Sequence, residues 1–375
     1  MMQLTKKFMT KFCLVLFVQS GLFFSTSFLY GAGLSPQNTF NLEVQDIFNK
    51  TKVFNPGLNG SLLLDCIKKG ASIAPLLAQN NMSSIMSAFD QASPDFMTWL
   101  FKNDPGLKKI NDSIVAKDYS DGEALLVIAI EYQKTSLVRL LLKQDGIDVN
   151  VKNKQGRSAL SFSIERKNLI VADLLIQNEN VDVNMKDNDG WAALHMAADW
   201  GEVAIVDSLL KNKKIDVNQG GRENRTALDL AVAKGHIAIV NSLLKQSKIN
   251  VNKKNISGKI ALHYAVDENH IAIVEKFLKD GRVDVNLQDN DGVTALHRAV
   301  MKGNKQLIQA LLDKDADFSI KNNAGKTTFD LAKESGNADF VQLIQSAEQM
   351  RPLKHALMAL KAKLSELAEE LAKMA

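Results

Sequence analysis

The chain has 375 residues, of which 46% are apolar and 23% charged, an ordinary composition for a folded protein. It contains only six prolines and no low-complexity tract, which argues against a long disordered arm. The formal net charge of +4 comes mostly from Lys6, Lys7 and Lys11, because the remainder of the chain carries 43 basic and 42 acidic residues. Such a balance offers no electrostatic case for nucleic-acid binding, which usually requires a concentrated basic face.

The first 32 residues have the layout of a secretory signal peptide. A basic start is followed by an apolar run over residues 12–30 and then by the small residues Gly31 and Ala32. Polar residues interrupt the run and weaken it as a membrane-spanning helix, with an uncleaved anchor as the alternative. Cleavage after Ala32 would place Tyr30 three residues upstream of the bond, an imperfect fit to the small-residue rule. We predict that the protein is exported, to the periplasm or outside the cell.

Residues 33–116 carry weaker signals. The segments 61–78 and 94–103 have helical character and are interrupted or bounded by prolines. We predict a helical N-terminal region built from one or two degenerate repeats, with a separate small helical domain as the alternative. An enzyme domain in this segment is a third hypothesis, but the segment has no histidine and no recognisable catalytic motif.

A fixed period dominates the centre of the chain. The dipeptide Val-Asn recurs every 34 residues, and an Ala-Leu element recurs half a period away. Three residues before each Ala-Leu stands Gly, or once Asn224, which indicates a turn with positive φ. Two short helical patterns follow, in one unit at about 192–200 and 203–210, and neither is long enough to be stable alone. We therefore expect stacking between units to stabilise the array. The Val-Asn pairs are Val149-Asn150, Val183-Asn184, Val217-Asn218, Val251-Asn252 and Val285-Asn286.

These units resemble the ankyrin-repeat family, whose unit is a β-turn plus two antiparallel helices with a T-P-L-H-x-A signature. The signature appears as AALHMA at 192–197, IALHYA at 260–265 and TALHRA at 294–299, and in weaker form at 226–231 and 327–332. Its proline is Ala in most units, and the period is 34 rather than 33. The resemblance implies an all-α ankyrin-repeat solenoid of about seven units over residues 117–349. It also implies that His195, His263 and His297 hydrogen-bond the adjoining turn.

Residues 350–375 form a candidate amphipathic helix. Its leucines alternate at intervals of four and three residues, the a/d pattern of a coiled coil. Lysines cluster in its first half and glutamates in its second, so antiparallel pairing with a second copy would bring opposite charges together. We predict such a homodimer; the alternatives are a helix folded back on the last repeat and a short pairing with an unrelated protein. The predicted oligomerisation residues are Leu353, Leu357, Leu360, Leu364, Leu367 and Leu371.

Motifs for catalysis, metals and cofactors fail on inspection. Gly325-Lys326-Thr327 imitates the end of a phosphate-binding loop, but Ile320 stands where that loop requires its first Gly. The Asp-Asn-Asp-Gly runs at 187–190 and 289–292 lack ligands at the first and last positions of a calcium loop. Repeat position explains most of the histidines, and successive repeats stand about 10 Å apart, too far to share a metal ion. We predict no enzymatic activity, no cofactor and no metal.

The resemblance also implies a partner-binding surface, because ankyrin arrays usually bind through the turn tips and the exposed side of the first helix, which form a concave face. The corresponding positions follow the turn Gly, follow the signature His, or precede the turn between the helices. Trp, Tyr and Arg at such positions dominate interface energetics. The alternative is that Trp191 and Trp200 pack over neighbouring repeats. The predicted partner-binding residues are Arg157, Trp191, Met196, Trp200, Arg225, Tyr264 and Arg298.

Together these features predict a non-catalytic scaffold that binds a protein partner. The leader and the family analogy suggest a host-directed effector. The alternative is a structural or assembly factor of the cell envelope that self-associates through the C-terminal helix. Neither nucleic acid nor, beyond an uncleaved leader, a membrane is an expected partner.

Overall fold

The computed structural model describes residues 125–143, 147–153 and 155–374. The predicted signal peptide, the N-terminal region 33–116 and the start of the first repeat lie outside the described residues. The chain divides into two units, residues 1–73 and 74–375, and every described residue belongs to the second.

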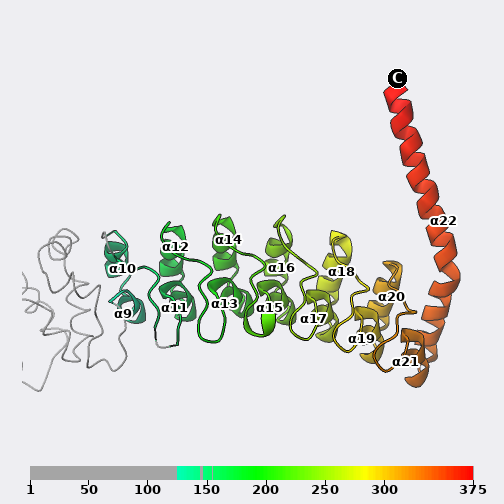
Figure 1. The fold of residues 1–375 in the computed structure, drawn as a ribbon, viewed down its shortest axis with the longest axis horizontal. Coiled ribbons are helices and arrows are strands. Elements are labelled where there is room, and N and C mark those ends of the chain that lie inside the picture. Colours follow the sequence, from blue (N-terminus) through cyan, green and yellow to red (C-terminus); the bar gives the residue numbers. More distant parts are fainter. Residues whose placement is uncertain (1–124, 144–146, 154, 375) are drawn as a thin grey trace, which may run out of the picture. The chain divides into compact units, whose positions relative to one another are not determined.

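The described residues form pairs of helices joined by short turns (Figure 1). The boundaries predicted from periodicity at 192–200 and 203–210 agree with α13 and α14 to within about one residue, and the all-α repeat fold is confirmed. A short 3₁₀ helix, η1 (Arg222–Asn224), precedes the fourth pair. The pairs are α9 (Leu125–Glu131) with α10 (Thr135–Leu141), α11 (Ala159–Glu165) with α12 (Leu169–Gln177), α13 (Ala193–Trp200) with α14 (Val203–Lys211), α15 (Ala227–Ala233) with α16 (Ile237–Leu244), α17 (Ala261–Asp267) with α18 (Ile271–Asp280), α19 (Ala295–Met301) with α20 (Lys305–Asp313), and α21 (Thr328–Glu334) with α22 (Ala338–Met374).

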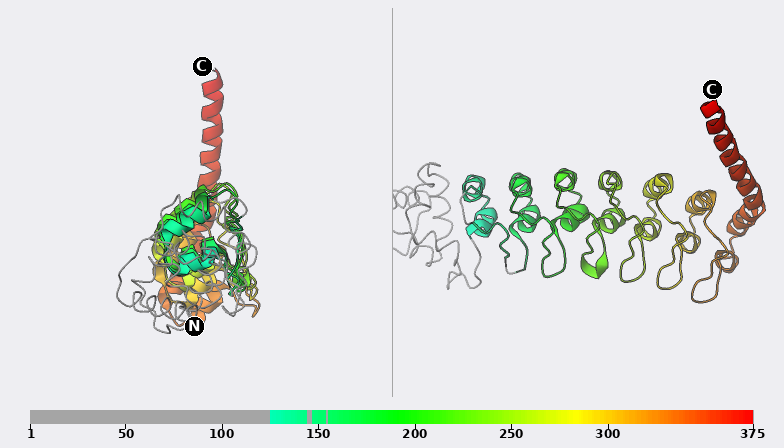
Figure 2. Two further views of the ribbon diagram at one scale, coloured as in Figure 1. Left: turned by 90° about the vertical axis from the view of Figure 1, so that its left-hand side faces the viewer. Right: turned by 45° about the horizontal axis from the view of Figure 1, so that its top comes forward.

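The pairs stack side by side in two layers. Each first helix contacts the first helix of the next pair, as α13 contacts α15, and each second helix contacts the next second helix, as α14 contacts α16. The long turns between pairs form a third row, beside the first helices (Figure 2). Because each pair contacts only its neighbours, stability comes from interfaces between adjacent repeats.

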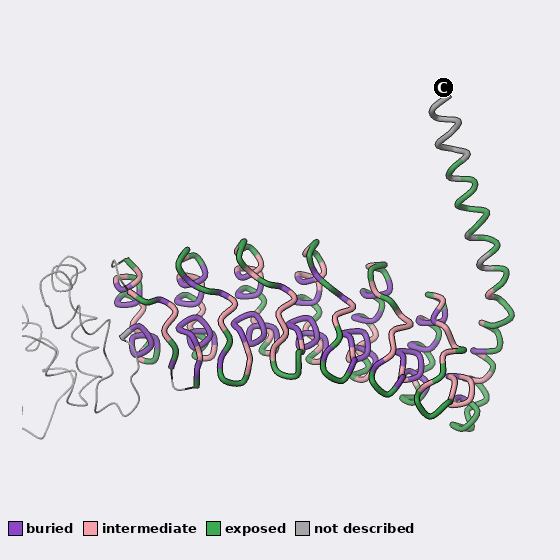
Figure 3. The backbone as a smooth tube through the Cα atoms, viewed as in Figure 1, coloured by how far each residue is buried: buried purple, intermediate pink, exposed green. Residues whose placement is uncertain are grey.

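The core lies between the two layers of helices (Figure 3). The signature leucines Leu194, Leu228 and Leu262 are at most 3% exposed, and the first helices that carry them contact one another in sequence. On α14 the buried side chains of Ile205, Val206 and Leu209 form one apolar face. Removing such a buried leucine costs about 2–5 kcal/mol in other proteins, which indicates how strongly each interface depends on these side chains.

The signature histidines connect each repeat to the next turn. His195 Nδ1 accepts a hydrogen bond from the Ala192 N–H at 3.1 Å, so its Nε2 carries the proton and donates to the Gln219 carbonyl at 2.9 Å. His263 makes the same pair of bonds, to the Ile260 N–H and the Val293 carbonyl. The role that the family resemblance implies for these histidines is thus confirmed.

The asparagines of the Val-Asn pairs form a second connection between repeats. Asn218 Nδ2 donates to the Lys248 carbonyl at 2.7 Å, and its Oδ1 accepts from the Asn250 N–H at 2.7 Å. Asn150, Asn184 and Asn252 make equivalent bonds to the repeat that follows each of them. One amide side chain therefore satisfies a donor and an acceptor of the neighbouring loop, which explains why Asn recurs with the period.

The turn glycines have the predicted positive φ. Gly190 has a φ of +84°, and Asn224, which replaces Gly in one repeat, has a φ of +57°. Asn is one of the few residues that tolerate this left-handed conformation. This turn position therefore recurs as Gly or Asn because its backbone has a positive φ.

The C-terminal helix differs from its predicted bounds. Instead of starting near residue 350, it is continuous with the second helix of the last repeat and runs from Ala338 to Met374, through Pro352. Phe340 and Ile344 are buried at its start, whereas Leu353, Leu357, Leu360 and Leu364 are 51–62% exposed. A helix folded back on the last repeat would bury these four leucines, so that alternative is wrong. Leu367 and Leu371 belong to the same helix, but their side chains lie outside the described residues.

Candidate partner-binding surface

The turns between helix pairs, except the one at 221–224, share one local design. An Asn or Asp at the start of the turn accepts two backbone N–H groups through its Oδ1; Asp187 accepts those of Asp189 at 3.0 Å and Trp191 at 2.8 Å. Asn255 does the same for Ser257 and Lys259. These bonds fix the backbone at the residue after the turn glycine, so the side chains at this position occupy equivalent places in successive repeats.

Neighbouring turn tips are bonded to each other. The Asn290 N–H donates to the Ser257 carbonyl at 3.0 Å, and the Ile256 N–H donates to the Glu223 carbonyl at 3.0 Å. The tips therefore form a continuous strip of backbone across these repeats.

Tyr264 lies at the centre of a cationic cluster drawn from two repeats. The Arg225 guanidinium is 4.7 Å from its ring centroid and the Lys259 ammonium 5.6 Å, both within cation–π range. Asn255 Nδ2 donates to the Tyr264 hydroxyl at 2.7 Å. Burial raises the pKa of Tyr264 above its ordinary value, so the hydroxyl stays protonated and available as a donor. The predicted partner-binding residues Arg225 and Tyr264 are thus in contact.

Arg298 forms the charged end of the same surface. Its Nη1 contacts both carboxylate oxygens of Asp267 at 2.8 Å, and its Nη2 pairs with Asp289. Burial alone would raise the pKa of Asp289, but hydrogen bonds from the Val293 N–H and from Arg298 outweigh burial and lower it. Arg298 is therefore held by two carboxylates, and its contacts are internal to the protein.

Arg157 is held in a similar way. It pairs with Glu165 of its own repeat, and its Nε lies 3.7 Å from Asp187 of the next repeat. The Arg157 side chain is 23% exposed, so it retains some access to solvent.

The two predicted tryptophans reach the surface. Trp200, the last residue of α13, is 40% exposed, and Trp191 is partly exposed beside the turn of the next repeat. The alternative that both are buried over neighbouring repeats therefore fails for Trp200 and holds only in part for Trp191.

The prediction that Met196 lies on the partner-binding surface is wrong. Met196 was predicted at the surface with Tyr264 and Arg298, but it is only 2% exposed. Phe162 and Leu230, at the same position in other repeats, are also buried. The position points into the interface between repeats, and only a side chain with a polar tip extends far enough to reach solvent. Met196 is therefore a core residue.

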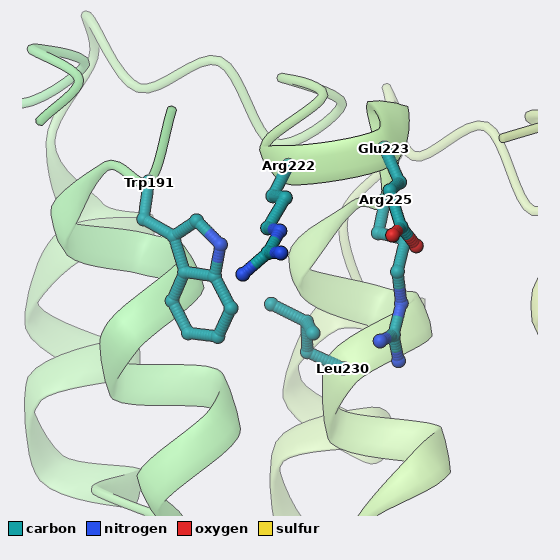
Figure 4. Close-up of a pocket in the computed structure, with 5 residues that line it drawn as sticks. All are labelled: Trp191, Arg222, Glu223, Arg225 and Leu230. Atoms are coloured by element: carbon teal, nitrogen blue, oxygen red, sulfur yellow. The ribbon is translucent and has the colours of Figure 1, made fainter. Parts of the chain in front are cut away.

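Sequence analysis missed Arg222 and Glu223. A surface pocket of about 180 Å³ is lined by Trp191, Arg222, Glu223, Arg225 and Leu230 (Figure 4). The available signal was the turn at 221–224, which has Gly where other turns have Asn or Asp and Asn where they have Gly. The remaining predicted residues thus lie on the turn tips and first helices, and two of them, Trp191 and Arg225, line this pocket.

Two further features bear on function. Within the described residues, no three His, Cys, Asp or Glu side chains lie close enough together to hold a metal ion. In the same part of the chain, no helix combines the length and apolarity that crossing a membrane requires.

Comparison with known proteins identifies similar repeats. The sequence matches a family model of ankyrin repeats (three copies) over residues 63–187, 170–255 and 262–352. The ankyrin repeat domain of Bcl-3, a member of the IkappaB protein family, is 25% identical with a TM-score of 0.55, and the match covers 60% of this chain and 99% of that one. The ankyrin repeat protein EF0377 is 28% identical with a TM-score of 0.47, and the match covers 50% and 96% respectively. No curated protein matches the sequence.

Proposed function

Because this chain belongs to the ankyrin-repeat family, whose repeats generally serve as protein-interaction modules, we propose that it is a non-catalytic scaffold that binds a protein through its turn tips and first helices. We call this the turn-tip surface. It comprises Arg157, Trp191, Trp200, Arg225, Tyr264 and Arg298.

One observation carries the proposal. Trp200 is 40% exposed and Trp191 lines an open pocket, so two large aromatic side chains remain accessible on the same repeat. Exposed Trp contributes little to folding but ranks among the residues that contribute most to protein interfaces. The ion pairs of Arg157 hold its guanidinium in a fixed position on the adjacent repeat, which reduces the entropy lost on binding.

The test is a pull-down with the full chain from host and bacterial-envelope extracts. We expect Trp191→Ala with Trp200→Ala to abolish capture of a partner while the melting temperature stays nearly unchanged. The matched control is Ile170→Ala with Ile237→Ala, which removes two exposed apolar residues from the second helices and should retain the partner. Capture that survives in the tryptophan variant, or is lost equally in both variants, would count against the turn-tip surface.

The extract that supplies the partner separates the two biological roles. Export, with a host protein as partner, fits a host-directed effector, which the leader favours. A partner from the bacterial envelope fits an assembly factor. Fractionation of cells that express the full chain tests export itself, since a chain retained in the cytoplasm would contradict both roles.

A specific observation also favours self-association. The exposed leucines Leu353, Leu357, Leu360 and Leu364 lie on one helix and leave an apolar stripe open to solvent. We expect an antiparallel pair of α22 helices to bury this stripe, with the lysines of one helix facing the glutamates of the other. Sedimentation equilibrium over a range of concentrations should show a dimer that Leu357→Glu with Leu360→Glu dissociates. A monomer mass at every concentration would rule the dimer out.

A further inference from the structure

The cation that follows the turn glycine pairs, in several repeats, with an acidic residue eight positions later. Arg157 pairs with Glu165, Lys259 with Asp267 at 3.1 Å, and Lys326 with Glu334 at 2.7 Å. The acid lies at the end of the first helix, and the cation reaches it along the helix face. These repeats therefore neutralise their own turn cation.

The fourth repeat lacks this acid. Arg225 occupies the cation position, but the residue eight positions later is Ala233. Within the described residues Arg225 forms no ion pair, and its buried Nε has no hydrogen-bond partner. The Arg225 guanidinium lies over the Tyr264 ring, and its N–H groups donate no hydrogen bond within the described residues. Arg225 can therefore accept an anion from outside the protein.

The turn of the same repeat is also different. Gly221 stands where Asp187 and Asn255 accept backbone N–H groups, so the turn lacks that side-chain cap and forms η1 instead. A Cβ at Gly221 would lie 3.0 Å from the His195 imidazole, so a side chain there would require the ring to shift by a few tenths of an ångström. The altered turn presents Arg222 toward Trp191 (Figure 4).

These two departures create the pocket. It is lined by the Trp191 ring, the Leu230 side chain, the two arginines Arg222 and Arg225, and Glu223 (Figure 4). Glu223 forms no ion pair with either arginine among the described residues. The pocket thus combines an apolar wall with two guanidinium groups, neither of which forms an ion pair with a carboxylate in the described part of the chain.

We propose that this pocket binds an acidic side chain, Asp or Glu, of a peptide segment in the partner, with the carboxylate on Arg225 and Arg222 and the neighbouring peptide residue against Trp191. Arginine presents its N–H donors in a planar fork that matches a carboxylate, and this match favours an acidic peptide. The inference rests on the proposed turn-tip surface and specifies the chemistry of its partner.

The test uses random linear peptides displayed on phage, selected against the full chain. Enriched peptides are synthesised with a fluorescent label, and each Asp or Glu is replaced by its amide. We expect one acidic residue to be essential, so that its amide binds the parent about 10- to 100-fold more weakly. Arg222→Gln with Arg225→Gln should weaken the acidic peptide similarly but leave the affinity of the amide peptide unchanged. Arg139→Gln, at an exposed arginine of the second helix α10 and outside the turn-tip surface, is the control and should have little effect.

A second variant avoids removing the arginines. Ala233→Glu supplies the acid that other repeats carry at this position, so it should pair with Arg225 and compete with the peptide carboxylate. Ala233→Gln has the same size without the charge. We expect Ala233→Glu to weaken acidic-peptide binding about tenfold or more and Ala233→Gln to have little effect.

The outcomes distinguish this inference from the proposed function. Peptides that depend on Trp191 but not on any acidic residue or on Arg225 would overturn the carboxylate pocket and leave the turn-tip surface intact. Peptides indifferent to Trp191→Ala, Trp200→Ala and the arginine variants would count against both. A selection that enriches no peptide on the parent over the arginine variant would also overturn the pocket.

Discussion

At the third position of the first helix, α13, α17 and α19 use His, whereas α15 and α21 use Asp, to accept the same backbone N–H. His263 accepts the Ile260 N–H, and Asp229 accepts the Thr226 N–H at 2.7 Å. Burial acts on the two groups in opposite ways because it disfavours the charged form of each. It lowers the pKa of His263 to about 4 and raises the pKa of Asp229 to about 6.

The histidine should make the protein sensitive to acid. Since the pKa of His263 is lower in the folded state, the unfolded chain binds the proton first and the free energy of unfolding falls as pH drops from 6.5 toward about 4. We expect the loss between pH 7 and pH 5 to be up to about 2 kcal/mol for this residue. Urea unfolding at pH 7 and pH 5 measures this loss. His263→Gln should lower the free energy of unfolding at pH 7 and shrink its difference between pH 7 and pH 5. An unchanged difference would show that His263 does not titrate on unfolding.

The aspartate should have the opposite effect. Because the pKa of Asp229 is raised on folding, stability falls as pH rises from 3.8 to about 6 and then levels off. Asp229→Asn removes this loss. Between pH 4 and pH 7, the free energy of unfolding of the variant should therefore rise relative to that of the parent by up to about 3 kcal/mol. The control is Asp330→Asn, at the equivalent position of the last repeat, where hydrogen bonds from Thr327 lower the carboxyl pKa. Its effect on the pH dependence should have the opposite sign, so equal effects of the two substitutions would contradict this account.

Single residues also show where sequence reasoning succeeds and where it stops. The signature histidines and the turn glycines were predictable because their roles are local to one turn and its neighbour. The burial of Met196 was not predictable, because it depends on how closely the next repeat packs against that position. Arg222 could not be placed because η1 replaces the turn found in the other repeats.

At the scale of elements, the Asn ladder joins consecutive loops. Asn218 bonds both the Lys248 carbonyl and the Asn250 N–H of the next repeat. Loss of its side chain leaves both groups without that partner, so Asn218→Ala should destabilise the protein by roughly 1–3 kcal/mol. Thermal or urea unfolding measures this, with the exposed Asn180→Ala as a control expected to have little effect. Equal stability of the two variants would mean that water replaces the ladder bonds at no cost.

Helix α22 shows why element boundaries are harder to predict than element types. The leucine pattern correctly indicated a helix after residue 350, but the pattern begins at Leu353 and so could not show where the helix starts. The helix passes through Pro352 and is continuous with the repeat from Ala338. Proline removes one backbone hydrogen bond, and the packing of Phe340 and Ile344 anchors the helix on the repeat side of that position. The periodic pattern could reveal the helix, but not that it continued the preceding repeat.

At the scale of the whole array, stability depends on interfaces between repeats rather than on single helices. Leu209 is fully buried on α14, so Leu209→Asp would place a charge between repeats and should unfold the neighbouring part of the stack. Circular dichroism and urea unfolding should show lost helix content and a lower midpoint. Ala204→Asp introduces the same residue at an exposed position of the same helix and should retain the parent midpoint. Similar behaviour of the two variants would contradict the dependence on stacking.

The repeat architecture also explains the limits of functional prediction. Period and signature identified the array, because each repeat must bury the same faces. The turn-tip surface is constrained less by packing, so its side chains vary from repeat to repeat, and pairing such as that of Arg157 with Glu165 appears only in three dimensions. The absence of this pairing at Arg225 became meaningful only by comparison with the other repeats.

The central claim is that the turn-tip surface binds a protein partner. Its most direct test is site-specific photo-crosslinking in cells, with a photoreactive residue placed in the full chain at position 191, on the turn-tip surface, or at position 237, on a second helix. We expect a discrete cross-linked product from position 191 that is absent from position 237. Cross-links from position 237 alone, or equal products from both positions, would contradict binding through the turn-tip surface.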